Sequence, residues 1–243
     1  MDRSLIYTLV LASLLACTCA LAQVPPEVRA FEEAAGGGSV LFRGKQAESY
    51  DRPANGNPYW TSSEFVPGTV VFEGNIYDGI LVNIDAVDGR ALVRKADNPI
   101  AVALLPASVG SIRTGDGRKF EGFGPDADLP EGFYQVLGEG RERVYVHVAK
   151  RLQSSSGNVN GDQIGYYDPR YNPDLTLHYA ISRTYYFMDG DGVFSRIKGR
   201  RALLRKFPEQ RREIRSALAA AGLDRPGTAF EDYCLTVLNT VAR

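Results

Sequence analysis

The chain has 243 residues, of which 44% are hydrophobic and 23% are charged, and its formal net charge is −1. A globular chain of this length can bury about 70% of the surface that it exposes when unfolded, so no disulfide framework is needed for stability. The near-zero net charge argues against a dedicated nucleic-acid-binding protein, which is usually basic.

Residues 1–22 have the pattern of a signal peptide. Arg3 lies in a short polar start, an apolar run covers residues 5–16, and Ala20-Leu21-Ala22 is the small-x-small motif that signal peptidase recognises. The apolar run is too short to span a bilayer, which requires roughly 20 residues. We therefore expect a periplasmic or secreted protein that begins at Gln23.

The cysteines allow a second interpretation of the N-terminus. Residues 14–17, LLAC, resemble a lipobox, and processing there would leave Cys17 lipidated and the protein tethered to a membrane. We expect the protein to contact a membrane only if Cys17 is lipidated.

Cleavage after Ala22 leaves Cys234 as a lone cysteine, which cannot form an intramolecular disulfide. It lies on or beside the apolar stripe of a predicted helix, which favours a buried hydrophobic position over a reactive thiol.

Residues 23–38, with two prolines and three consecutive glycines, are expected to form a flexible lead-in. Residues 39–198 then read as one antiparallel β domain, because short apolar strands alternate with turn signals. These signals are Gly74-Asn75, suited to a type II′ turn, Asp88-Gly89, suited to a type I′ turn, Asp116-Gly117 and Glu139-Gly140. The pattern predicts a mainly β fold, a sandwich or a partly closed barrel. Residues 68–112 are loosely similar to a small SH3-like barrel.

A two-residue loop at Asp88-Gly89 would place Val87 opposite Arg90 and Ile84 opposite Val93. That register gathers the apolar side chains on one face and leaves Asn83 and Asp85 on the solvent side.

The segment YYFMDGDGVFSRI, residues 185–197, suggests either a calcium loop or a hairpin turn. An EF-hand loop needs a ligand at position 5, glycine at 6 and glutamate at 12. Counting from Asp189, these positions hold Val193, Phe194 and Arg200. We therefore predict a turn centred on Gly190-Asp191, and no calcium dependence.

Residues 199–243 are expected to form two or three short helices packed on the β domain. Pro208 favours a helix start, Gly222 a helix end, and Thr228 with Glu231 has the spacing of a capping box. Residues 196–215 hold nine Lys or Arg and two Glu, a net charge of +7. A solvated helix face is the ordinary interpretation, and contact with an anionic surface, such as a lipid headgroup or an acidic glycan, is the alternative.

No catalytic motif is present, and no cofactor or metal site is expected. The two histidines, His147 and His178, lie in predicted strands without a nearby metal ligand, so we expect them to face solvent. Paired carboxylates could still be brought together by the fold, which leaves a carboxylate-dependent hydrolase of an envelope polymer open as an alternative.

Loop aromatic residues are the remaining candidates for a binding site. Tyr59 and Trp60 lie in a Gly-, Asn- and Pro-containing loop, and Tyr166, Tyr167 and Tyr171 lie in a long polar loop over residues 153–174. Aromatic side chains on loops often contact partners or stack on sugars, although they also fold back over the core.

The order of three segments resembles an uncharacterised family of exported Bacteroidota proteins. These segments are NPYWTSSEFVPGTVVFEGNIYDGILVNID, GFYQVLGEGRERVYV, and RTYYFMDGDGVFSRI followed by LLRKFPEQRREI. The resemblance covers most of residues 40–243 and implies no functional residues. Together with the export signal, it leads us to expect an envelope-associated binding or structural protein with an unknown ligand or protein partner, and not an enzyme.

Overall fold

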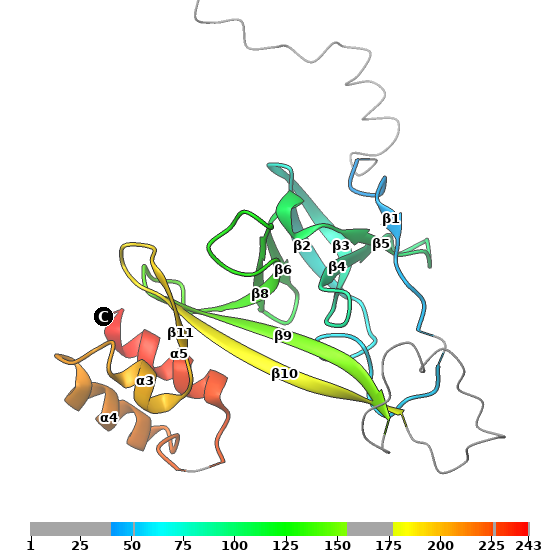
Figure 1. Ribbon diagram of the computed structural model, residues 1–243. Helices are drawn as coiled ribbons and strands as arrows, with labels where there is room; N and C mark the ends of the chain where they lie inside the picture. The colour runs from blue at the N-terminus through cyan, green and yellow to red at the C-terminus, as the bar shows by residue number, and fades with distance from the viewer. Residues whose placement is uncertain (1–39, 51, 155–176, 226, 243) are drawn as a thin grey trace, which may run out of the picture. The chain divides into compact units, whose positions relative to one another are not determined.

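The computed structural model describes residues 40–50, 52–154, 177–225 and 227–242. The chain divides into two compact units, Met1–Val40 and Leu41–Arg243, and the elements described here belong to the second. As predicted, this unit is mainly β, with an antiparallel sheet followed by three short helices (Figure 1).

The strands are β1 (Lys45–Gln46), β2 (Val66–Phe72), β3 (Asn75–Asp85), β4 (Arg90–Arg94), β5 (Val102–Leu104), β6 (Val109–Thr114), β7 (Lys119–Phe123), β8 (Gly132–Leu137), β9 (Arg143–Ser154), β10 (Leu177–Met188) and β11 (Phe194–Ile197). A short 3₁₀ turn, η1 (Pro106–Ser108), precedes β6, and the helices are α3 (Arg200–Leu204), α4 (Arg211–Ala220) and α5 (Phe230–Val241).

All described strands belong to one 11-stranded sheet in the order β1-β5-β4-β3-β2-β6-β7-β8-β9-β10-β11. β6 returns to pair with β2, and every strand from β7 onward pairs with the strand before it in the chain. The sheet does not close into a barrel, since β1 and β11 remain its two edges.

The first hairpin turns one residue earlier than predicted. Phe72 pairs with Asn75, so the central residues are Glu73 and Gly74 and not Gly74-Asn75. Both have positive φ angles, 48° and 81°, which is the conformation of a type I′ turn and not of the predicted type II′ turn. Gly74 supplies this conformation without strain, whereas Glu73 is the one described non-glycine residue that adopts it.

The β3–β4 hairpin has a longer loop than expected, and this shifts the predicted register by two residues. Asp85 pairs with Arg90 and Val82 with Val93, which leaves residues 86–89 as the loop. A shift of two preserves the face of each side chain, so the predicted apolar face is still buried. The predicted solvent face is wrong, however, because Asn83 and Asp85 are 8% and 1% exposed.

The acidic segment at the β10–β11 connection is a turn. A two-residue turn centred on Gly190-Asp191 would pair Met188 with Val193, whereas Met188 pairs with Phe194 and the loop covers residues 189–193. The Oδ1 atom of Asp189 accepts hydrogen bonds from the backbone N–H groups of Asp191 and Val193, at 3.1 and 2.9 Å. The carboxylate therefore stabilises the loop backbone.

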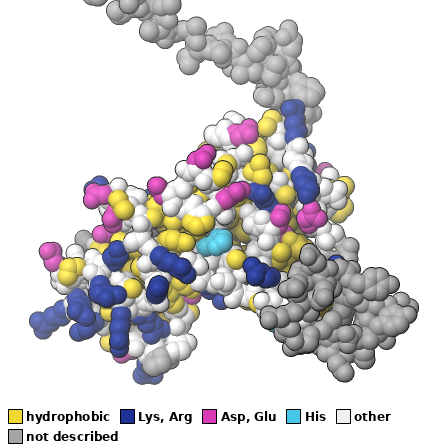
Figure 2. All heavy atoms as spheres, in the orientation of Figure 1, with side chains coloured by type: hydrophobic (Ala, Val, Ile, Leu, Met, Phe, Trp, Pro, Cys, Tyr) yellow, Lys and Arg dark blue, Asp and Glu magenta, His cyan; other side chains and the backbone are white. Residues whose placement is uncertain are grey.

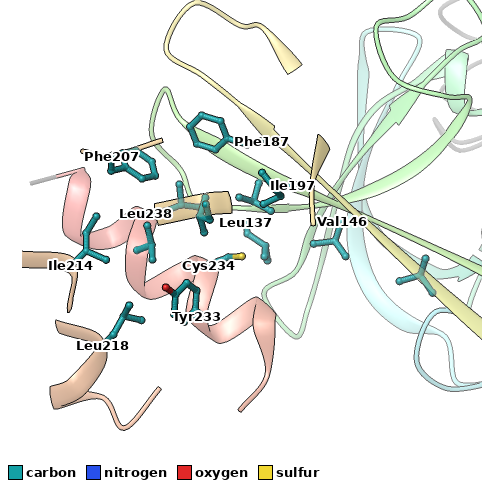
Figure 3. Close-up of a cluster of buried hydrophobic side chains, with 14 of the residues drawn as sticks. Leu137, Val146, Phe187, Ile197, Phe207, Ile214, Leu218, Tyr233, Cys234 and Leu238 are labelled. Atoms are coloured by element: carbon teal, nitrogen blue, oxygen red, sulfur yellow. The ribbon is translucent and has the colours of Figure 1, made fainter. Parts of the chain in front are cut away.

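The helices share a core with the C-terminal half of the sheet (Figure 3). Phe187 and Ile197 of the strands pack in one cluster with Ile214 of α4 and Leu238 of α5. Cys234 lies in this cluster fully buried, which confirms its predicted position, and burial raises the pKa of its thiol.

The predicted capping box at Thr228 and Glu231 is wrong. The N-cap of α5 is Ala229, which makes no side-chain cap. The Thr228 hydroxyl instead accepts a hydrogen bond from Arg200, and Glu231 accepts one from the Tyr185 hydroxyl at 2.7 Å. These two side chains thus connect α5 to α3 and β10.

Candidate functional site

The predicted aromatic pair lies in a segment that runs along the end of β3. The backbone N–H of Trp60 donates to the Ile84 carbonyl at 2.8 Å, and the backbone N–H of Ala86 donates to the Pro58 carbonyl at 3.0 Å. Successive side chains of an extended segment point to opposite sides. Tyr59 therefore lines one hollow and Trp60 another, so the structure does not bring the predicted pair into a single site.

The other predicted contact residues, Tyr166, Tyr167 and Tyr171, lie outside the described residues.

The larger hollow has a volume of about 610 Å³, and we call it the tyrosine cleft. Three tyrosines line it: Tyr50 and Tyr59 come from the segment before β2, and Tyr179 comes from β10. The rings of Tyr50 and Tyr59 meet edge to face, with centroids 6.4 Å apart. Apolar side chains such as Phe65 and polar ones such as Asn57 also line the cleft, so it offers both ring surfaces and hydrogen-bonding groups.

Asp85 organises the tyrosines from beneath. Its Oδ2 atom accepts a hydrogen bond from the Tyr50 hydroxyl at 2.5 Å, and its Oδ1 atom accepts from the N–H groups of Val87 and Asp88 at 2.8 and 2.9 Å. Both carboxylate oxygens are thus occupied in a group that is almost fully buried. We conclude that Asp85 positions Tyr50 and is poorly placed for acid–base chemistry.

Burial and the same carboxylate raise the pKa values of the cleft hydroxyls. Burial raises the pKa of Tyr50 well above its ordinary value, and the hydrogen bond to Asp85 raises it further. Burial and then the charge of Asp85 also raise the pKa values of Tyr59 and Tyr179. The cleft therefore presents neutral hydroxyl groups: that of Tyr50 donates to Asp85 and can still accept, whereas those of Tyr59 and Tyr179 can both donate and accept hydrogen bonds.

A buried lysine fixes the segment that carries Tyr59. The Nζ atom of Lys150 on β9 donates to the backbone carbonyl of Asn57 at 3.0 Å and to its side-chain oxygen at 3.3 Å. Burial lowers the pKa of Lys150, and the charge of Arg183 lowers it further. Since the Tyr59 N–H also donates to the Asn57 side chain at 3.0 Å, the tyrosine is held before any ligand arrives.

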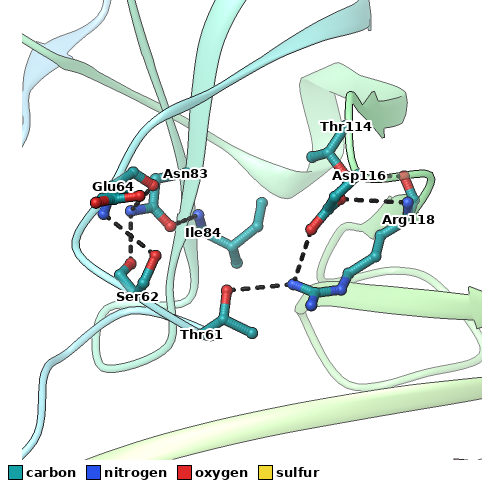
Figure 4. A network of polar contacts seen from close by, with 8 residues as sticks. All are labelled: Thr61, Ser62, Glu64, Asn83, Ile84, Thr114, Asp116 and Arg118. Carbon is teal, nitrogen blue, oxygen red and sulfur yellow. Dashed lines mark hydrogen bonds and ion pairs between the residues drawn. The ribbon is translucent and has the colours of Figure 1, made fainter.

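The smaller hollow, about 250 Å³, lies beside Trp60. Figure 4 shows the polar contacts of side chains that line it, among them Asn83, Asp116 and Arg118. Trp60 meets Phe120 edge to face at 5.2 Å, and the buried amide of Asn83 donates to the carbonyls of Ser62 and Glu64 at 3.0 and 3.2 Å. These contacts hold residues 60–64 against β3.

A charged pair stands at the rim of this smaller hollow. Arg118 lies 3.3 Å from Asp116 and donates to the Thr61 hydroxyl at 3.2 Å. Burial favours a higher pKa for Asp116, but the hydrogen bond from Thr114 and the charge of Arg118 outweigh it and lower the pKa. Asp116 is consequently an ion-pair partner that remains charged.

His147 is partly buried, and its predicted exposure to solvent is wrong. Its ring lies against that of Tyr134, with centroids 4.9 Å apart, and burial lowers its pKa.

Among the described residues no group of three or more His, Cys, Asp or Glu could hold a metal ion. None of the described helices is long and apolar enough to cross a membrane.

Sequence reasoning missed Tyr50, Tyr179 and Asp85 as members of this site. Tyr50 and Asp85 are 35 residues apart, and no local periodicity links them. The one available signal was the pair of polar residues, Asn83 and Asp85, in the apolar second half of β3.

No protein-family model, no curated protein and no solved structure matches this chain. The geometry of the tyrosine cleft is therefore the basis for a functional assignment.

Proposed function

We propose that this is an exported envelope protein that binds a polyhydroxylated ligand, such as a short glycan segment of an envelope polymer, in the tyrosine cleft. The observation that carries the proposal is the set of three neutral tyrosines on a fixed backbone around one hollow. Its volume is within the range of roughly 300–1,000 Å³ that is usual for ligand sites. Export is supported by the signal-peptide pattern of residues 1–22.

The chemistry of the cleft suits a sugar. A sugar ring has an apolar C–H face, which packs on an aromatic ring, and hydroxyl groups at its edge, which bond to tyrosine hydroxyls and amides. The cleft combines Tyr59 and Tyr179 with the polar side chains of Gln46 and Asn57. Because Asp85 and Lys150 already hold the Tyr50 side chain and the Tyr59 segment, little ordering is required on binding.

Binding is better supported than the hydrolase that the sequence left open. Glu48 is the one carboxylate among the described lining residues, and it forms an ion pair with Lys45 at 2.6 Å. A two-carboxylate mechanism needs a second acid on the other side of the scissile bond. Asp85 does not line the cleft, and both of its oxygens are engaged.

The test is calorimetric titration of the protein with soluble fragments of envelope polymers. We expect one fragment class to bind, and Tyr179→Ala to weaken its binding about tenfold, since an aromatic contact contributes of the order of 1 kcal/mol beyond its area. Tyr77→Ala is the matched control, because Tyr77 is also partly exposed but lies on β3 outside the cleft.

Two results would overturn the proposal. The first is that no fragment binds, or that both variants weaken binding equally. The second is reproducible release of cleaved product that a single Asp or Glu substitution abolishes, which would make the protein a hydrolase.

A further inference from the structure

The helical end of the described unit carries an unusual concentration of positive charge. Residues 196–215 have a net charge of +7, whereas the rest of the chain has −8. Figure 2 shows dark-blue side chains gathered over the end that holds α3 and α4, with few magenta ones among them. We call the exposed cations of this region the basic face: Arg196, Lys198, Arg201, Arg205, Lys206, Arg211, Arg212 and Arg215.

The basic face is not neutralised within the described part of the chain. None of its eight side chains forms an ion pair with a described residue, since the ion pairs there lie on the sheet, beside β1, or between Arg183 and Glu231. Arg200, in the same run, behaves differently. Its guanidinium donates to the carbonyls of Arg225 and Thr228, both at 2.7 Å, and lies over the ring of Tyr233. The run therefore contains one structural arginine and eight exposed cations without a carboxylate partner among the described residues, although one of them, Lys206, also lies over the ring of Phe187.

The arrangement on α4 separates charges of opposite sign. At 3.6 residues per turn, Arg211, Arg212 and Arg215 fall within an arc of about 100°, and Glu213 falls on the other side of the helix. Ile214 and Leu218 of the same helix are buried in the core, so the helix cannot rotate to bring Glu213 to this arc. The arginine arc is thus a fixed feature of the fold.

We propose that the basic face binds the anionic headgroups of a phospholipid bilayer. Its cations come from the end of β11, from α3 and from α4, so a partner that engages them together must present negative charge over a broad area. A bilayer with anionic lipids does so, and each Lys or Arg near such a surface contributes about 1 kcal/mol. Arginine, which supplies six of the eight cations, also bonds phosphate oxygens through two parallel N–H groups. This contact is independent of the tyrosine cleft.

The experiment is sedimentation of the purified protein with vesicles of phosphatidylcholine, with and without phosphatidylglycerol as a third of the lipid. We expect binding only to the anionic vesicles, and its loss as salt is raised. Replacing Arg211, Arg212 and Arg215 by Gln should weaken binding about a hundredfold, because each cation accounts for roughly a fivefold change.

The control variant is R43Q/K95Q/R113Q, which removes three exposed cations from outside the basic face. We expect it to bind within about twofold of the unchanged protein. Should the α4 variant fail to fold, R201Q/R205Q on α3 serves in its place, with an unchanged melting temperature as the check on folding.

Three outcomes would overturn the proposal. Equal binding to neutral vesicles would indicate an apolar or lipid anchor, and equal losses in the α4 and control variants would indicate a general charge effect. Binding to heparin or to duplex DNA through the α4 arginines, without binding to anionic vesicles, would assign the basic face to an acidic polymer.

Discussion

At the scale of single residues, Asn83 and Asp85 of β3 are buried beneath residues 57–64, which the alternating pattern of β3 does not indicate. Asn83 and Asp85 would face solvent if the sheet were bare on that side. They are buried because a distant part of the chain covers them. Asn83 donates to two carbonyls of that segment, and Asp85 accepts from the Tyr50 hydroxyl and from the adjoining loop of residues 86–89. A buried polar group without a partner is costly, so these side chains favour one position of the covering segment.

Replacing Asp85 by Ala should destabilise the protein by about 2–4 kcal/mol, because the Tyr50 hydroxyl and two backbone N–H groups lose their acceptor. Urea denaturation measures the loss. Asp78→Ala is the control, since Asp78 is exposed and accepts one hydrogen bond, from Thr69. A loss at Asp85 no larger than the loss at Asp78 would show that the carboxylate does not organise Tyr50 and the adjoining loop.

His147 should make stability depend on pH. Burial lowers its pKa in the folded state, so the unfolded chain takes up a proton more readily. The free energy of unfolding should therefore fall as the pH is lowered from about 7 to about 5.5, through the ordinary histidine pKa of about 6.5. Urea denaturation of the unchanged protein and of His147→Gln at several pH values checks this, because carboxylates contribute equally to both. Parallel curves would mean that protonation of His147 is not linked to folding.

At the scale of elements, the three short helices depend on contacts beyond their own sequences. α3 has five residues and α4 ten, and isolated helices of such lengths are marginal in water. None of the described helices has a side-chain N-cap. Burial of Leu203, Ile214 and Leu238 in the shared core compensates for these weak ends.

Arg200 should be the exception among the cations of residues 196–215. Arg200→Ala removes two hydrogen bonds to carbonyls and a cation–π contact with Tyr233, so we expect a loss of about 2 kcal/mol in the free energy of unfolding. The neighbouring Arg201→Ala should change it by less than about 0.5 kcal/mol, because that side chain is exposed. Similar values for both variants in denaturation experiments would contradict the structural role of Arg200.

The sequence predicted the elements better than their exact pairings. The antiparallel strands, the buried helix position of Cys234 and the turn at Asp189 all followed from periodicity and turn residues. The hairpin registers did not, because Asp88-Gly89 is compatible with both a two-residue loop and the observed four-residue loop. Contacts with distant residues favour the longer loop. One of them is the hydrogen bond from the backbone N–H of Lys150 to the Ala86 carbonyl, which cannot be read from the local sequence. The tyrosine cleft depends on the same kind of contact, which is why only Tyr59 among its three tyrosines could be anticipated.

At the scale of the whole described unit, the core joins β8–β11 to the helices, and the sheet continues without interruption to β1. Trp60 packs against this core and also meets Phe120 of β7. Elements that share buried contacts in this way usually unfold together.

We therefore expect one cooperative unfolding transition. Trp60 is the only tryptophan of the chain, so its fluorescence reports on residues 57–64, the covering segment, while far-ultraviolet circular dichroism reports on the helices. The two signals should change with the same urea midpoint. Distinct midpoints would show that the helices and the covering segment are separate cooperative units.

The strand order also bears on how the protein folds as it is synthesised. Of the ten strand pairings, eight join strands consecutive in the chain, and only β2–β6 and β1–β5 do not. Consecutive hairpins form early because short loops lose little entropy on closure, whereas pairings across intervening strands form more slowly. β2 must therefore keep one edge unpaired until β6 has been synthesised. During that interval its exposed backbone is open to pairing with other chains. The slowest and most aggregation-sensitive step of folding should thus be the arrival of β6 at β2, well before the helices complete the core.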